Sequence, residues 1–246
     1  MMEEEKVEIN LPEIQEKLYQ RLKDSGWGDK LKGFLLSGDM LRILEQLMEQ
    51  SNDGAKFTPR LKQIFRFLEE CPYDKLKLIM MLQDPYAFLN DEGETVADGI
   101  PMSCSNTKRI QPSLRFVHQA IGDTVFPGER YRGPVDLKVW ANQGVLLMNA
   151  AITTTIGKTG VHYKLWQPFV VYILDMLAWG NGGLIYLYMG KKAQEYMKIT
   201  PSNNYKIMVT HPAYAAHTKA DSWDSENCFV KINELLTKNG KEIIKW

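Results

Sequence analysis

Three polar side chains of types that take part in catalysis each follow a short apolar segment. Asp84 and His211 each come two residues after such a segment, and Asn149 comes directly after another. Together they offer a carboxylate, an amide and an imidazole, which can stabilise charge, recognise a hydrogen-bonding edge and donate a proton. Taken singly, each has an ordinary structural explanation: a capping aspartate, a turn asparagine and a structural histidine. Their equivalent positions favour a common site.

The apolar segments that precede these residues have the length and composition of buried parallel strands. The strands are predicted at residues 76–82, 145–148, 184–189 and 206–209, with helical segments between or after them at 136–142, 166–178, 192–197 and 227–238. This alternation predicts an α/β fold, a three-layer α/β/α sandwich around a four-stranded, mostly parallel sheet. The carboxyl ends of parallel strands meet at one edge, where such sheets bind ligands.

At that edge Asp84, Asn149 and His211 are expected to converge on one pocket, with Tyr86 and Tyr214 as flat walls. A carboxylate, an amide with both donor and acceptor, a histidine and aromatic surface suit a heterocyclic base held by its edge. This set of groups does not distinguish a nucleobase from another planar amide.

The first seventy residues are predicted to be packing helices. A helix starts near Pro12, another covers residues 37–48, and a third covers 59–68 with Leu61, Ile64, Phe65 and Leu68 facing inward. Ile14 is expected on the inner face of the first helix, and residues 1–11 are expected to be loose. No repeat or linker divides the chain, so residues 1–246 are interpreted as one domain.

Composition narrows the classes of protein. Lys plus Arg and Asp plus Glu number 30 each, so any nucleic-acid surface must be local. Three widely separated cysteines lack the spacing of a disulfide framework, a zinc ribbon or an iron–sulfur cluster. The acidic start and the lack of an 18-residue apolar run predict a cytoplasmic protein with no membrane segment.

One stretch has the character of a phosphate-binding surface. Residues 99–122 contain no acid but include Lys108, Arg109 and Arg115. Within them, Gln111-Pro112-Ser113 reads as a loop entering a helix, and a hydroxyl at a helix start suits a phosphate. A solvated basic face explains the same residues equally well.

Five motifs, in order, resemble the family 1 uracil-DNA glycosylases over about residues 27–246. They are residues 83–86 (the water-activating loop, GQDPYH in the family), 111–114 (the proline-rich loop), 144–149 (GVLLLN), 210–212 (the start of HPSPLS) and the tail 233–246 (NELL…IDW). The resemblance implies a monofunctional glycosylase that removes uracil from single- and double-stranded DNA in base excision repair. It implies a monomer that needs no metal or cofactor, with a proteinaceous inhibitor of these enzymes as a candidate partner.

The resemblance also implies residue roles. His211 would donate to uracil O2, and Asp84 would stabilise the cationic sugar and orient water. Asn149 would read O4 and N3–H, Tyr86 would exclude the thymine methyl, and Gln83 would help to hold the base through its backbone. Gln111, Pro112 and Ser113 would contact DNA, with Ser113 on a flanking phosphate.

Four positions depart from the family pattern. Leu82 replaces a glycine, Ala87 replaces the histidine that helps to position water, and Met102 replaces the aromatic residue that stacks on uracil. Ala215 stands where a leucine wedges into the duplex, so Tyr214 or His217 beside it is a candidate substitute. A glycosylase for another modified pyrimidine is therefore a second interpretation, and a weakly catalytic DNA-binding accessory protein is a third. The presence of Asp84 and His211 argues against the third, since a pure binder needs no such pair.

Overall fold

The computed structural model describes residues 10–180 and 182–246. Its centre is a four-stranded sheet in the order β3-β2-β5-β6, in which every pairing is parallel. The strands are β2 (Leu78–Leu82), β3 (Val145–Asn149), β5 (Ile185–Met189) and β6 (Tyr205–Val209). All residues of the first three are buried, as expected for strands covered on both faces, while β6 at the edge is partly exposed. The predicted fold class is confirmed.

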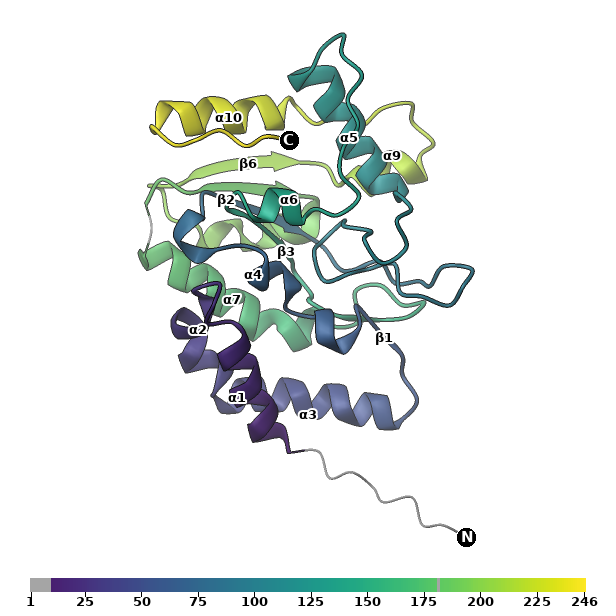
Figure 1. Ribbon diagram of the computed structural model, residues 1–246, viewed down its shortest axis with the longest axis vertical. Helices are drawn as coiled ribbons and strands as arrows, with labels where there is room; N and C mark the ends of the chain where they lie inside the picture. The colour runs from purple at the N-terminus through teal and green to yellow at the C-terminus, as the bar shows by residue number, and fades with distance from the viewer. Residues whose placement is uncertain (1–9, 181) are drawn as a thin grey trace.

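Helices cover both faces of this sheet. Figure 1 shows α5 (Pro112–Val125) and α10 (Cys228–Lys238) on one side, with α7 (Tyr163–Gly180) on the other. Three more helices pack outside α7: α1 (Leu11–Arg21), α2 (Trp27–Leu35) and α3 (Gly38–Asn52). One continuous core of buried side chains joins these layers.

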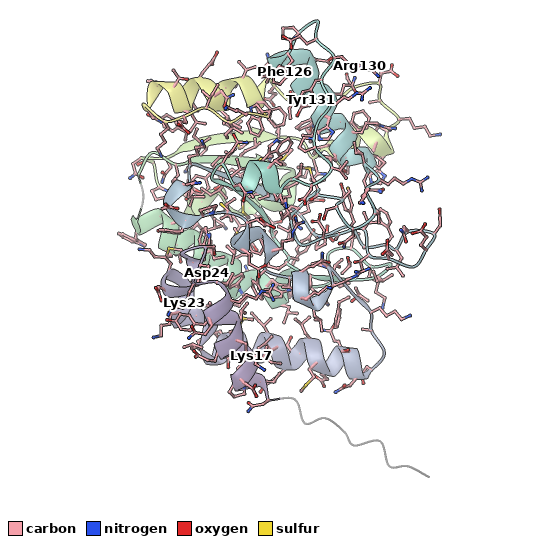
Figure 2. All side chains as sticks on the ribbon, viewed as in Figure 1. Lys17, Lys23, Asp24, Phe126, Arg130 and Tyr131 are labelled. Atoms are coloured by element: carbon pink, nitrogen blue, oxygen red, sulfur yellow. The ribbon has the colours of Figure 1, made fainter. Side chains whose placement is uncertain are left out.

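Short elements complete the chain. They are β1 (Phe57–Thr58), which pairs with β4 (Thr154–Thr155), the α-helices α4 (Arg66–Glu69), α6 (Lys138–Ala141), α8 (Lys191–Gln194) and α9 (Pro212–His217), and the 3₁₀ helices η1 (Leu61–Gln63), η2 (Tyr73–Lys75) and η3 (Glu195–Ile199). The loop after α5 is ordered by the ring of Phe126, which stacks on Tyr131 at a centroid distance of 5.1 Å (Figure 2).

Helix starts follow the local sequence. The Asn10 side chain accepts a hydrogen bond from the Glu13 N–H ahead of Pro12 in the first turn of α1. Ser37 caps α3 in the same way, through the N–H groups of Asp39 and Met40. The predicted helices at these positions are therefore confirmed, although α3 continues to Asn52.

The predicted helix over residues 59–68 is wrong. The chain there forms η1 and α4, separated by a break, and Leu61 is 67% exposed rather than buried. Tertiary contacts override the apolar periodicity, because the preceding residues pair as β1 and the Arg66 side chain turns to Asp98 and Asp136. Ile14 on α1 is also exposed, at 38%, contrary to its predicted place on an inner face.

Two helices were not predicted from the sequence. Helix α2 buries Trp27, Leu31 and Leu35 completely, and α9 follows directly after His211. The long polar stretch before residue 99 is also not a simple surface loop, since Asp98 is fully buried.

Candidate active site

The ends of the parallel strands bring the predicted polar residues to one edge of the sheet. Leu82 lies opposite Asn149 in the β2–β3 register, and Met189 lies opposite Val209 in the β5–β6 register. The loops that continue from β2 and β3 are joined at the backbone, because the Ala151 N–H donates to the Gln83 carbonyl at 3.0 Å. Asp84, Asn149 and His211 therefore follow aligned strand ends, as predicted.

The loop after β2 is fixed by its main chain. The Tyr86 carbonyl accepts from Thr58 Oγ1 at 3.1 Å, and the Ala87 carbonyl accepts from the Gly157 N–H at 2.6 Å. These bonds tie the loop to β1 and to the segment after β4. The backbone of this loop is therefore fixed by hydrogen bonds within the protein, and it holds the side chains of the loop in place.

Asp84 is a half-buried acceptor within this loop. Its Oδ2 accepts a hydrogen bond from the Gly160 N–H at 2.6 Å. Burial raises the pKa of the Asp84 carboxyl, while the Gly160 N–H and the Tyr163 hydroxyl lower it. The carboxylate is thus supported by directed donors, which suits the stabilisation of positive charge.

His211 caps helix α9 and has a defined tautomer. Its Nδ1 accepts from the Ala213 N–H at 3.1 Å, so the proton of the neutral ring is on Nε2. Burial, with a smaller effect of His217, lowers the pKa of His211 to about 4. At neutral pH the residue is an uncharged donor through Nε2.

Gly190 allows this histidine to lie close to the end of β5. The glycine has a φ of +90°, and an added Cβ would lie 2.8 Å from His211 Cβ and 3.6 Å from Gln83 Nε2. A side chain there would displace the catalytic candidate, so the position requires glycine. The only sign of this requirement in the sequence is that Gly190 directly follows the predicted strand at residues 184–189.

A pocket lies beside these groups and contains three predicted substrate-binding residues. Tyr86, Met102 and Asn149 line it together with apolar residues that include Pro85, Phe67 and Ile152. Gln83, Asp84 and His211 are not among its lining residues. The Asn149 side chain is 5% exposed, and in the described part of the chain no group is within hydrogen-bond distance of its amide. An amide that faces a pocket without a protein partner is available to a ligand.

The pocket wall opposite Asn149 is built by a strained turn. Met102 has a φ of +63°, in the left-handed region, and its carbonyl accepts from the Tyr86 hydroxyl at 3.3 Å. Burial raises the pKa of Tyr86 well above its usual value, so the phenol remains a neutral donor. Tyr86 and Met102 therefore hold each other in place.

A buried ionic network that sequence reasoning missed supports this turn. Asp98 is fully buried; its Oδ2 accepts from Ser103 Oγ at 2.6 Å and from the Ser105 N–H at 2.8 Å, and it lies 3.0 Å from Arg66 Nη1. Arg66 Nη2 also contacts both oxygens of Asp136, at 2.8 and 2.7 Å. Burial lowers the pKa of Arg66, but Asp98 and Asp136 outweigh this and raise it. In the sequence, Asp98 is an isolated acidic residue before Gly99, and that local pattern does not indicate an ionic network.

The predicted DNA-contacting residues lie at the start of α5 and on α9, which pack side by side (Figure 1). Pro112 occupies the first turn of α5, Gln111 is its N-cap with no side-chain capping bond, and Ser113 is 8% exposed. The first N–H groups of such a helix are suited to an anion. Lys108, Arg109 and Arg115 are exposed nearby in the chain, in agreement with a basic surface.

On α9 the exposures distinguish the wedge candidates. Tyr214 is 65% exposed and His217 is exposed, whereas Ala215 is 4% exposed. Ala215 belongs to the buried core, so it is less accessible to DNA than its neighbours on α9. The tyrosine beside it projects from the helix instead.

Within residues 10–180 and 182–246, no helix is long and apolar enough to span a bilayer. No group of three or more His, Cys, Asp and Glu side chains in the same residues is arranged to hold a metal ion.

Comparison with known structures supports the fold. A uracil-DNA glycosylase from mimivirus superposes with a TM-score of 0.80 at 23% identity, covering 97% of this chain and 89% of that protein. A variant of the mimivirus enzyme solved in complex with UGI gives a TM-score of 0.81 at 24% identity and covers 97% of this chain and 91% of that one. The enzyme from Nitratifractor salsuginis is more distant, with a TM-score of 0.54, 19% identity, and coverage of 80% and 88%.

Sequence comparison establishes the family. No family model matches this sequence. A uracil-DNA glycosylase from Xanthomonas euvesicatoria is 29% identical over 229 residues, 91% of this chain and 90% of that protein. One from Acinetobacter baumannii strain SDF is 30% identical over 235 residues, which cover 94% of this chain and 95% of the relative. With relatives of this similarity along nearly its whole length, and with the strand-edge site described above, the chain belongs to the uracil-DNA glycosylases.

Proposed function

We propose that this protein is a family 1 uracil-DNA glycosylase that hydrolyses the N-glycosidic bond of deoxyuridine in DNA. It releases uracil and leaves an abasic site for base excision repair, with residues 1–246 acting as one domain and as a monomer. The observation that carries the proposal is the unpartnered amide of Asn149 in a pocket with Tyr86 and Met102. No other polar side chain of the pocket is so suited to read a base.

Recognition follows from hydrogen-bond matching. A base in a duplex must be flipped out before it can enter the pocket. The Asn149 amide can accept from uracil N3–H and donate to O4, a pattern that cytosine reverses. Tyr86, fixed through the Met102 carbonyl, occupies the space of a thymine methyl, and the Gln83 backbone lies at the same edge. Met102 covers the face of the base with a soft apolar side chain.

Bond cleavage is assigned to Asp84 and His211. As the glycosidic bond breaks, positive charge grows on the sugar and negative charge on the base. The half-buried Asp84 carboxylate stabilises the sugar and orients a water molecule, and the Nε2–H of neutral His211 donates to uracil O2. Neither role needs a metal or a cofactor.

DNA binding is assigned to the surface of α5 and α9. Ser113, with Gln111 and Pro112, lies at a helix start suited to a flanking phosphate. Tyr214 fills the gap left by the flipped nucleotide, with His217 at its side. A proteinaceous inhibitor such as the UGI bound by the mimivirus enzyme is expected to compete for this surface.

A second candidate is a glycosylase for another modified pyrimidine. Met102, which is flexible and unbranched, is the observation that favours it, because a softer wall accommodates a different base. A third is an accessory protein that binds DNA with little turnover.

One experiment separates these candidates. The protein is incubated with single- and double-stranded oligonucleotides that contain uracil or one of a panel of modified pyrimidines, and the free base is measured. Uracil release supports the proposal, preferential release of another base supports the second candidate, and DNA binding without release supports the third.

Two variants test the recognition mechanism. Asn149→Asp should gain cytosine release, because a carboxyl oxygen accepts from the cytosine amino group, and Tyr86→Ala should gain thymine release. Tyr131→Phe, which alters a phenol at the opposite end of α5, is the control and should keep uracil specificity. A folded Asn149→Asp enzyme that acts on uracil and never on cytosine would contradict the role of the amide.

A further inference from the structure

We propose that Phe88 is a stacking platform for an unpaired base of the DNA strand, namely a base next to the flipped uridine. The proposal rests on the proposed function, because it needs a uridine in the pocket and a strand that continues beyond it. Phe88 lies outside the motifs that carry the family resemblance, at the start of a hairpin formed by residues 88–96.

The Phe88 ring lies beside the base pocket. Its centroid is 5.8 Å from that of Tyr86, which lines the pocket, and the two ring planes are tilted by 58°. Phe88 lies outside the lining of the pocket and is 44% exposed. A base held against Tyr86 is joined to the next nucleotide through a single phosphate, so the neighbouring base comes within reach of the Phe88 ring.

The hairpin holds this ring in a fixed place. Across the hairpin, the Val96 N–H donates to the Phe88 carbonyl at 3.4 Å. At the turn, the Asn90 side chain accepts from the N–H groups of Glu92 and Glu94, at 3.1 and 2.8 Å. An aromatic ring on an ordered support binds a base with little loss of conformational entropy.

The hairpin is also joined to the segment that leads into α5. The Asn106 side-chain amide donates to the carbonyls of Thr95 and Ala97, both at 3.0 Å. At the turn, Asp91 Oδ2 lies 3.7 Å from Arg109 Nη1. The hairpin therefore connects the base pocket with the residues before the start of α5, where a flanking phosphate is proposed to bind. A strand that occupies both places passes this hairpin.

The charge of the hairpin favours a base over a phosphate as its ligand. Residues 88–96 include Asp91, Glu92 and Glu94 but no lysine or arginine, so they do not attract the DNA backbone. The exposed apolar side chains of the hairpin are Phe88 and Leu89. Aromatic rings bind the faces of unpaired bases with little dependence on sequence. The contribution of Phe88 should therefore be largest on single strands, where the neighbouring base is free.

The test removes the ring and the base in turn. Binding of single-stranded oligonucleotides with one uridine is measured by fluorescence anisotropy, in an Asp84→Asn background that slows cleavage. The neighbours of the uridine are adenines in one oligonucleotide and abasic tetrahydrofuran spacers in the other. Phe88→Ala should raise the Kd of the first by about tenfold and that of the second by less than about twofold.

Three further variants serve as controls. Phe88→Tyr keeps an aromatic ring and should bind like the parent protein, whereas Phe88→Leu keeps apolar volume but should behave like Phe88→Ala. Trp179→Ala removes a ring that is 92% exposed at the end of α7 and should leave both Kd values unchanged. Equal losses on the two oligonucleotides in Phe88→Ala would overturn the proposal, because Phe88 would then act by supporting Tyr86. Unchanged binding of both would also overturn it.

The salt dependence separates a base contact from a phosphate contact. The slope of log Kd against log salt concentration should be the same in Phe88→Ala and in the parent protein. A shallower slope in the variant would overturn the assignment of a base as the ligand.

A second readout reports on stacking directly. The fluorescence of 2-aminopurine, placed on either side of the uridine, should be quenched on binding to the parent protein and to Phe88→Tyr, but not to Phe88→Ala. Quenching that does not depend on Phe88 at either position would overturn the platform. Uracil release by the wild-type protein without Phe88-dependent quenching would overturn the platform alone. Phe88-dependent quenching without uracil release by the wild-type protein would instead overturn the proposed function alone.

Discussion

The edge of the sheet and the surface formed by α5 and α9 serve one substrate but are built in opposite ways. At the sheet edge, Asp84 and His211 are half-buried, and each accepts a main-chain N–H. On the helical surface, Tyr214 is 65% exposed, and in the described part of the chain no side-chain hydrogen bond holds it. One region is preorganised, and the other is free to adapt.

The difference follows from the task of each region. Charge that develops during bond cleavage is stabilised best by groups that are already oriented, because reorganisation then costs nothing in the transition state. A duplex that holds a flipped nucleotide differs in shape with its sequence and pairing. Side chains that contact it therefore benefit from conformational freedom. We therefore expect substitutions at the sheet edge to change the rate of cleavage, and substitutions on the surface to change the choice of substrate.

The largest expected effect is at the sheet edge. Asp84→Asn and His211→Ala should each reduce single-turnover uracil release by about 10²–10³, because each removes a group that acts on transition-state charge. DNA binding, measured by fluorescence anisotropy, should be nearly unchanged. The exposed Asp91→Asn is the control for loss of a carboxylate. Near-wild-type turnover in either variant would show that the assigned role is wrong.

The second effect is on the pH dependence of stability, and it concerns the inner face of α5. His118 on α5 is 9% exposed, and burial lowers its pKa to about 4 from 6.5. The unfolded chain then binds more protons between these values, so this contribution to stability is present above pH 6.5 and is lost as the pH falls towards 4. The free energy of unfolding should fall by about 3 kcal/mol for this residue.

Urea unfolding at several pH values measures this loss. His118→Gln should flatten the dependence, leaving the share of His211, whose pKa is also lowered to about 4. His217→Gln, on the exposed end of α9, should change it only slightly, through the smaller effect of His217 on the pKa of His211. An equally steep dependence in His118→Gln would show that His118 is not the buried titrating group.

A third effect distinguishes the two neighbours on α9. Ala215→Leu adds volume in a site that is 4% exposed, so we expect a loss of about 1–3 kcal/mol of stability and no gain on U·A duplexes. The same change at the exposed Ala220 is the control and should cost little. Improved activity on duplex DNA in a stable Ala215→Leu protein would restore Ala215 as the wedge position.

The smallest effect is expected for the wedge itself. Tyr214→Ala should reduce uracil release from U·A duplexes by about tenfold. Flipping the nucleotide costs about a few kcal/mol of stacking and pairing, and the tyrosine offsets part of this cost by filling the gap. Release from single strands should be unaffected, and U·G mismatches should fall between. Tyr214→Leu keeps filling volume and serves as the control. An equal loss on single-stranded and duplex substrates would assign Tyr214 to the base pocket rather than to the duplex gap.

Much of the sheet and its edge was predictable from the sequence. Short apolar runs are typical of strands buried on both faces, and parallel strands place their carboxyl ends together. For that reason the sequence alone indicates Asp84, Asn149 and His211 as candidate site residues. Tyr86, Met102 and Asn149 line one pocket, as the family resemblance implies. These are properties of local pattern and strand direction.

Other features depend on residues far apart in the chain. The apolar spacing at 59–68 predicts a helix, but Arg66 pairs with Asp98 and Asp136, which lie 32 and 70 residues away, and the segment divides. Local periodicity carries no information on such partners. The same is true of Gly160, whose N–H reaches Asp84 only because the segment after β4 returns to the loop after β2.

By itself, then, the sequence determined which segments form the central strands and which polar side chains stand at their ends, because an apolar run and the residues that follow it are local properties of the chain. The tertiary structure alone decided the state of those side chains. It places Asp84 against the Gly160 N–H, sets the His211 tautomer through the Ala213 N–H, and turns Tyr214 outward while Ala215 packs inward. Burial and hydrogen-bond direction arise only when distant segments meet, and they set the pKa and the reach of each group.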